Sequence, residues 1–173
     1  MPEERFGAVT FKGNAMTLVG PEIKVGDKAP NFSALAQDMS EVTRSTDGGK
    51  VRLFLSVPSL DTPVCDTEAK RFNAAATGFG ENVLTYAVSV DLPFAQKRWC
   101  GDTGSDSIKT LSDHRSVSFG EAFGTHVKEL RLLSRAVFLV DQNDVVQYVE
   151  YVKEIGEEPN YEAALAALKH AVS

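Results

Sequence analysis

The sequence lacks most features that would anchor the protein or direct it to nucleic acid. Two cysteines among 173 residues are too few for the disulfide framework of a small secreted domain. No apolar run approaches the roughly 20 residues that a bilayer-spanning helix needs. Eighteen basic against 24 acidic residues give a net charge of −6, and no stripe of lysine and arginine is present that could bind phosphates. We therefore expect no membrane anchor and no nucleic-acid partner.

Metal ligands and cofactor motifs are equally scarce. The three histidines, His114, His126 and His170, have no ligand spacing with Cys65 and Cys100, and the cysteines are too far apart to form a C-x-x-C pair. No haem, flavin or metal motif is found. The sequence therefore predicts catalysis, if any, by side chains alone, with no cofactor and no metal.

The chain itself is that of an ordinary globular protein. Hydrophobic residues make up 43% and charged residues 24% of it, and its length suits one domain with a real core. The first residues are acidic and polar, whereas a secretory signal has a basic start and an apolar middle. We therefore expect one domain in the cytoplasm.

Strand and helix patterns alternate along the chain, which predicts a mixed α/β fold with a central sheet covered by helices. Short β-prone runs around Lys12-Gly13-Asn14 predict a hairpin from Ala8 to Gly20. The other expected strands are Val51–Val57, Asn82–Val90, Thr110–Ser112, Arg135–Asp141 and Val145–Val152, and the expected helices are Pro63–Ala76, Pro93–Cys100, Phe119–Phe123 and Asn160–Val172.

Cys65 lies where a helix should begin. Thr62 is a good N-cap residue and Pro63 is the favoured type at the first helical position, so Cys65 falls in the first turn. The unsatisfied N–H groups and the macrodipole at this end favour negative charge and lower the pKa of a thiol. The position therefore suits a cysteine that reacts as a thiolate.

Nearby charges act in both directions. Asp66 and Glu68 would disfavour a thiolate if they faced the sulfur, and Glu68, three residues on, is the more serious of the two. A compensating cation is therefore expected, and Arg135, which directly precedes an apolar strand, is a better candidate than Lys70 or Arg71.

Each of these residues, taken alone, also has a purely structural interpretation. A cysteine in a first turn is more often structural than reactive, Thr62 alone is a helix cap, and Arg135 alone is a solvated or ion-paired strand end. Residue chemistry by itself leaves the reactivity of Cys65 open.

The spacing Pro58-x-x-x-Thr62-x-x-Cys65 resembles the PxxxTxxC motif of peroxiredoxins. The chain is most similar to the thiol peroxidases, which are atypical two-cysteine peroxiredoxins. The stretches that carry the resemblance run from one end of the chain to the other: VTFKGN, VGDKAPNF, SLDTPVCDTEAKRFN, DLPFAQKRWCG, RAVFLVDQND and EPNYEAALAALK. Trp99, where the family commonly has phenylalanine, is the one difference noted, and it is a change between aromatic residues.

The resemblance implies a thioredoxin-like fold over residues 1–173, with residues 1–20 as an N-terminal β-hairpin extension. It implies a peroxidase that reduces hydrogen peroxide and organic hydroperoxides, forms a homodimer and uses thioredoxin as its reductant. Cys65 matches the peroxidatic cysteine and Cys100 the resolving cysteine, with which it would form an intramolecular disulfide. Thr62, Arg135 and Pro58 match the other residues of the active site.

A disulfide needs Cα atoms within about 7 Å of each other, which two cysteines on separate helices of a reduced enzyme are not expected to meet. We therefore expect the first turn around Cys65 and the helix that carries Cys100 to unwind during turnover. Leu92, Phe94 and Trp99 are expected to belong to the core, with a dimer face or an apolar substrate pocket as the alternatives.

Two other functions have to be weighed against a peroxidase. A disulfide-exchange factor or redox-regulated binding module of thioredoxin fold would leave Thr62 and Pro58 unexplained and lacks the usual C-x-x-C. A structural role with two inert cysteines would not explain the spacing of Pro58, Thr62 and Cys65 either.

Overall fold

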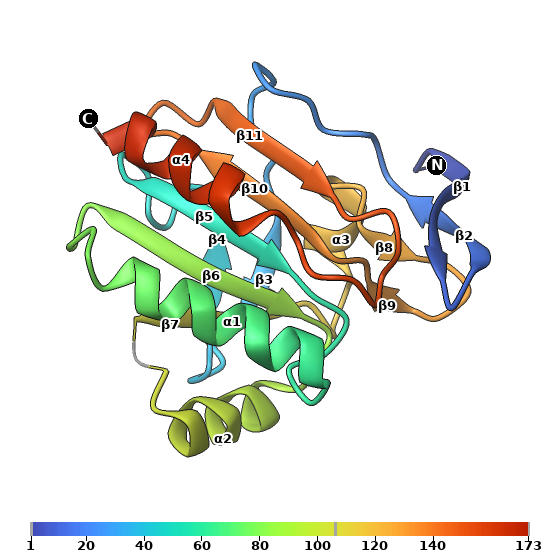
Figure 1. The fold of residues 1–173 in the computed structure, drawn as a ribbon, viewed down its shortest axis with the longest axis horizontal. Helices are drawn as coiled ribbons and strands as arrows, with labels where there is room; N and C mark the ends of the chain where they lie inside the picture. The colour runs from blue at the N-terminus through green and yellow to red at the C-terminus, as the bar shows by residue number, and fades with distance from the viewer. Residues whose placement is uncertain (1, 106, 173) are drawn as a thin grey trace.

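The computed structural model describes residues 2–105 and 107–172. Its centre is a seven-stranded sheet in the order β11-β10-β5-β6-β7-β3-β4 (Figure 1). These strands are β3 (Ser33–Leu35), β4 (Glu41–Thr43), β5 (Val51–Ser56), β6 (Val83–Ser89), β7 (Ile108–Ser112), β10 (Ala136–Val140) and β11 (Val146–Tyr151). A four-stranded sheet lies at one end, in the order β1-β2-β8-β9. Its strands are β1 (Glu4–Phe11), β2 (Asn14–Val19), β8 (His126–Val127) and β9 (Leu132–Leu133).

Helices cover both faces of the large sheet. On the face towards the viewer in Figure 1, α1 (Pro63–Ala76) and α4 (Tyr161–Val172) lie across β5, β6 and β10. The opposite face is covered by α3 (Ser118–Ala122), and α2 (Pro93–Thr103) packs beside β7. Strands β5, β6 and β7 are parallel neighbours, so α1 and α2 are the crossover connections between them.

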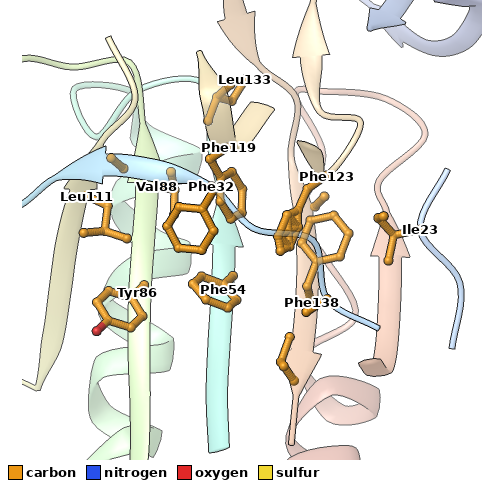
Figure 2. Packing of buried hydrophobic residues seen from close by; sticks show 14 of the residues in the cluster. Ile23, Phe32, Phe54, Tyr86, Val88, Leu111, Phe119, Phe123, Leu133 and Phe138 are labelled. Carbon is orange, nitrogen blue, oxygen red and sulfur yellow. The ribbon is translucent and has the colours of Figure 1, made fainter. Parts of the chain in front are cut away.

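Strand β5 is buried on both sides, and its side chains alternate between two cores. Leu53 and Leu55 point to the core under α1 and α4, where Phe72 and Leu168 meet them. Phe54 points to the other face, into a cluster of aromatic rings (Figure 2). The rings of this cluster pack at centroid distances of 4.3–6.4 Å; they are Phe32, Phe54, Tyr86, Phe119, Phe123 and Phe138. This packing holds β5 in the interior of the sheet, between β10 and β6, and the loop that follows β5 begins at the end of the strand.

The predicted order of strands and helices is confirmed, including the N-terminal hairpin. Its turn consists of Lys12 and Gly13, both with positive φ (51° and 81°), between the paired residues Phe11 and Asn14. Such a two-residue turn matches the twist of the strands that it joins. The first strand begins at Glu4, earlier than the expected Ala8, and α2 runs to Thr103 rather than to Cys100. Four strands of two or three residues, β3, β4, β8 and β9, were not expected.

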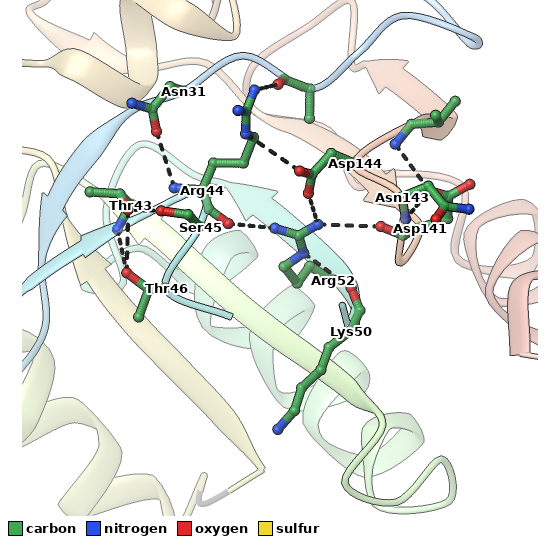
Figure 3. Close-up of polar contacts among 12 residues, drawn as sticks. Asn31, Thr43, Arg44, Ser45, Thr46, Lys50, Arg52, Asp141, Asn143 and Asp144 are labelled. Carbon is green, nitrogen blue, oxygen red and sulfur yellow. Dashed lines mark hydrogen bonds and ion pairs between the residues drawn. The ribbon is translucent and has the colours of Figure 1, made fainter. Parts of the chain in front are cut away.

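A buried arginine, Arg52, and a partly exposed one, Arg44, close the end of the large sheet opposite to α1's first turn (Figure 3). Arg52 at the start of β5 bonds the carboxylate of Asp144, the carbonyl of Asp141 at 3.2 Å and the carbonyl of Arg44 at 2.7 Å. Arg44 Nε lies 3.6 Å from the second oxygen of Asp144. One carboxylate therefore holds two guanidinium groups and joins β5 to the turn between β10 and β11.

Within the described ranges, 2–105 and 107–172, none of the helices has the length and apolar character needed to cross a bilayer.

Candidate active site

The first turn of α1 has the local structure that the sequence predicts. Thr62 is the N-cap, with extended backbone (φ −102°, ψ 148°), and Pro63 follows at the first helical position. The Thr62 hydroxyl accepts a hydrogen bond from the Cys65 N–H at 3.4 Å and donates to the Ser59 carbonyl at 2.9 Å. These two bonds fix the turn, and Cys65 is fully buried in it.

A guanidinium group faces the Cys65 sulfur. Arg135 directly precedes β10, and its Nη2 lies 3.2 Å from Cys65 Sγ. Its Nε donates to the Ile155 carbonyl at 3.0 Å, so the side chain is held in place, and only 2% of the residue is exposed. Burial lowers the pKa of Arg135, but the negative charges of Cys65 and Glu68 outweigh it and raise that pKa above its usual value. The guanidinium therefore stays charged at any physiological pH, 3.2 Å from the Cys65 sulfur.

Glu68 forms an ion pair with Arg135. Its Oε2 accepts a hydrogen bond from Arg135 Nη1 at 2.5 Å, and the residue is fully buried. Its other oxygen, Oε1, has no hydrogen-bond partner among the residues that the structure describes. Burial raises the pKa of Glu68 to about 7, although Arg135 acts in the opposite direction. From the sequence, Glu68 was expected to disfavour a thiolate at Cys65. In the structure Glu68 and Cys65 both contact the guanidinium of Arg135.

An apolar cavity of about 190 Å³ lies beside this turn. The wall nearest to Cys65 consists of Pro58, Ser59, Thr62, Pro63, Val64 and Arg135. Residues of the small sheet and of the loops around it form the rest: Phe11, Val127, Leu130, Leu132, Leu133, Ile155 and Gly156. Pro58 is buried and lies two residues after the end of β5. The structure thus brings Pro58, Thr62, Cys65 and Arg135 together at the end of one cavity.

Cys100 packs against the same core as Cys65, but farther across the large sheet, towards β7. Its sulfur accepts a hydrogen bond from Gln37 Nε2 at 3.3 Å, and the same amide group donates to Thr110 Oγ1 on β7 at 2.8 Å. Cys100 lines a separate cavity of about 550 Å³ together with Tyr86 and Lys109. No disulfide joins Cys65 and Cys100 in this structure.

The strand register shows how far apart the two cysteine environments are. Thr110 on β7 pairs with Ala87 on β6, which pairs with Leu55 on β5, which pairs with Val137 on β10. Three strand spacings separate Thr110 from Val137, or roughly 14 Å at about 4.8 Å each. Arg135 lies two residues before Val137, so the partners of the two sulfurs stand at opposite sides of the sheet centre.

The three apolar residues around Cys100 do not share one environment. Trp99 is buried at 7% exposure and belongs to the core under α1, as expected. Leu92 and Phe94 are 52% and 69% exposed, so their assignment to the core was wrong. Leu92 is the N-cap of α2 and Phe94 lies in its first turn, whereas the buried residues of this helix are Pro93, Gln96 and Trp99. None of the three lines the apolar cavity beside Cys65.

Comparison with known proteins identifies the family. The redoxin family model matches residues 24–165. A thiol peroxidase from Halalkalibacterium halodurans is 58% identical over 166 residues, which covers 95% of this chain and 99% of that protein. A thiol peroxidase from Bacillus subtilis is 52% identical, with 95% and 98% covered. The chain belongs to the thiol peroxidases of the redoxin family.

Solved structures agree with this assignment. A peroxiredoxin-like protein from Aquifex aeolicus superposes on this thiol peroxidase with a TM-score of 0.89 at 41% identity, covering 96% of this chain and 99% of that one. A thiol peroxidase from Chromobacterium violaceum shares the fold, with a TM-score of 0.83 at 19% identity and 94% and 95% covered. The expected thioredoxin-like peroxiredoxin fold is confirmed, and the chain is a peroxidase of this type rather than a disulfide-exchange factor or an inert structural protein.

Proposed function

We propose that the protein reduces hydroperoxides with Cys65 as the nucleophile and Cys100 as the resolving thiol. The observation that carries this proposal is the 3.2 Å contact between Cys65 Sγ and the buried Arg135 guanidinium, at the start of a helix and beside an apolar cavity. The helix N-terminus and the guanidinium both stabilise negative charge at this place, and the thiolate is the form of cysteine that attacks a peroxide.

In the first step the Cys65 thiolate attacks one oxygen of ROOH in line with the O–O bond. The S–O bond forms as the O–O bond breaks, and the leaving alkoxide takes up a proton to become the alcohol. Arg135 and the N–H groups of the first turn stabilise the charge that spreads over the breaking bond. The Thr62 hydroxyl donates its single proton to the Ser59 carbonyl. By rotating, it can donate that proton to the peroxide instead. Pro58 excludes water from this end of the cavity.

The product is a sulfenic acid on Cys65, which condenses with a second thiol. We assign that thiol to Cys100: its sulfur attacks the Cys65 sulfur, water leaves and an intramolecular disulfide forms. A dithiol protein such as thioredoxin then exchanges with this disulfide, becomes oxidised itself and returns both cysteines to thiols. Because the two sulfurs lie against Arg135 and Gln37 at opposite sides of the sheet centre, α2 and the first turn of α1 have to unwind for this step.

The cavity beside Cys65 favours organic hydroperoxides over hydrogen peroxide. Its lining is mostly apolar, with Ser59, Thr62 and Arg135 as the polar residues, so an alkyl or aryl group can be buried there while the peroxide oxygens reach Thr62 and Arg135. Leu132→Asn should lower kcat/KM for cumene hydroperoxide several-fold more than kcat/KM for hydrogen peroxide. An equal loss for both substrates would contradict the proposal that the cavity binds the organic group of the hydroperoxide.

We further propose a homodimer and a cytoplasmic location. Leu92 and Phe94 are large apolar side chains, mostly exposed and close together at the start of α2, which suits a face that a second copy covers. A cycle that depends on two thiols and a dithiol reductant suits the reducing cytoplasm. The hairpin pairs with β8 through β2, which supports one folding unit over residues 1–173.

Peroxide consumption with thioredoxin as the reductant tests the proposal. Cys65→Ser should be inactive. Cys100→Ser should oxidise once per chain and then lose turnover with thioredoxin, and Lys97→Ala, an exposed change on α2, should behave as wild type. Full activity of Cys65→Ser would end the proposal for the nucleophile, and full turnover of Cys100→Ser would end the proposal for the resolving thiol.

A further inference from the structure

Hydrogen bonds join the segment that carries Cys65 to the segment that carries Cys100. We name these the peroxidatic segment (residues 59–69) and the resolving segment (residues 91–101). They are far apart in the chain, but α2 lies directly beside the first turns of α1 (Figure 1). Both segments have to unwind if the proposed Cys65–Cys100 disulfide is correct, and the inference below rests on that proposal.

Asp91 forms the first link. Its carboxylate accepts hydrogen bonds from the Ser59 hydroxyl at 2.7 Å and from the Leu60 N–H at 2.8 Å. A third bond comes from the Ser89 hydroxyl at 2.7 Å, which anchors the carboxylate to the end of β6. Asp91 is the first residue of the resolving segment, and the loop that it holds leads directly into the Thr62 cap. If the loop moved away alone, the carboxylate would lose two of these three donors.

Trp99 forms the second link. Its indole N–H donates to Asp66 Oδ1 at 2.7 Å, while the ring is buried in the core under α1. Burial raises the pKa of Asp66, but hydrogen bonds from Lys70 and Trp99 outweigh it and hold that pKa below its usual value. Asp66 is the residue after Cys65, so this bond ties the neighbour of one cysteine to the neighbour of the other, Cys100.

We propose that Asp91 and Trp99 are positioning residues that make the two segments open in a single event. Opening one segment alone would leave a carboxylate or an indole N–H of the other without its partners in a partly buried place, which costs more than opening both. The consequence for the reaction is direct: the Cys65 sulfenic acid is uncovered only when Cys100 is uncovered too. The acid therefore meets the resolving thiol before a second peroxide can oxidise it further.

Hydrogen exchange of the reduced protein tests the coupling without any catalysis. In wild type, the slowest amides of the two segments should exchange at one common rate. In the Asp91→Asn, Trp99→Phe double variant both segments should exchange about ten-fold faster or more, since each lost bond involves a charged acceptor, and their rates should differ from each other. Two clearly different rates in wild type would overturn the inference.

Kinetics of single variants provide the second test, with Trp99→Phe as the conservative change because it keeps an aromatic ring and removes only the donor. Sulfenic acid should form within two-fold of the wild-type rate, whereas the subsequent disulfide should form several-fold faster. Lys97→Ala serves as the control on the same helix and should change neither rate. An unchanged rate of disulfide formation in Trp99→Phe would overturn the role of Trp99.

The two proposals fail in different ways. If wild type forms no Cys65–Cys100 disulfide with peroxide, the proposed function fails, and the exchange rates of the reduced protein still decide whether the segments are coupled. If the disulfide forms but the exchange rates of the segments differ, only the coupling fails.

Discussion

Replacing Glu68 with glutamine should change how the stability of the protein depends on pH. Burial raises the pKa of this carboxyl from 4.5 to about 7 in the folded protein, with Arg135 opposing the shift. The folded state therefore binds its proton more tightly than the unfolded state does. Between pH 4.5 and 7 the folded protein holds more protons, so its free energy of unfolding falls as the pH rises.

The size of the effect follows from the difference between the two pKa values. A rise from 4.5 to about 7 corresponds to about 3 kcal/mol at about 1.4 kcal/mol for each pKa unit. Glutamine keeps an oxygen that accepts the hydrogen bond from Arg135 Nη1, so the variant resembles the protonated wild type. Below pH 4.5 the two proteins should have nearly equal stability; the advantage of the variant should then grow as the pH rises, to about 3 kcal/mol by pH 7.5.

Urea unfolding at pH 5, 6, 7 and 7.5, in the presence of a reductant, measures this difference. Glu162→Gln, an exposed change on α4, is the control and should follow the wild type at every pH. The free energy of unfolding of Glu68→Gln should still fall somewhat as the pH rises, because burial also raises the pKa of Asp113 to about 6. Parallel curves for wild type and Glu68→Gln would refute the reasoning, as would a growing advantage of the wild type at higher pH.

Three further changes test other parts of the structure. Arg52→Met should lower the free energy of unfolding by about 3 kcal/mol, because it removes one of the two guanidinium groups at Asp144 and the donor to the carbonyls of Arg44 and Asp141; a loss below about 1 kcal/mol in urea unfolding would contradict this. Gln37→Met removes the N–H donor to the Cys100 sulfur and should speed disulfide formation a few-fold in rapid-quench experiments, while an unchanged or lower rate counts against a restraining role. Phe94→Asp should convert the proposed dimer into monomers in analytical ultracentrifugation, and an intact dimer would place the interface elsewhere.

The parts of the site that follow from local patterns could be predicted from the sequence. A threonine, a proline and a cysteine at this spacing after an apolar run define a capped first turn, and the structure has that turn at Thr62. Arg135 could be proposed because it stands at a strand end. The strands of two or three residues, such as β8 and β9, were missed because so short a run shows no periodicity.

What the sequence could not provide depends on the order of the strands. Glu68 meets Arg135 only because β10 lies beside β5, which brings residues 67 positions apart to 2.5 Å. The exposure of Leu92 and Phe94 likewise depends on how α2 packs on β7. The sequence does not distinguish an apolar residue at a helix start that is buried from one that is exposed. The bond between Trp99 and Asp66 is also a tertiary contact without a local pattern.

Treatment of the reduced protein with one equivalent of hydroperoxide, followed by intact-mass and peptide analysis, tests the central claim most directly. We predict that wild type loses two hydrogens and yields one linked peptide pair that contains Cys65 and Cys100. Cys100→Ser should instead gain one oxygen, located on Cys65. Oxidation that begins at Cys100, or a wild-type product in which Cys65 stays a thiol, would contradict the account.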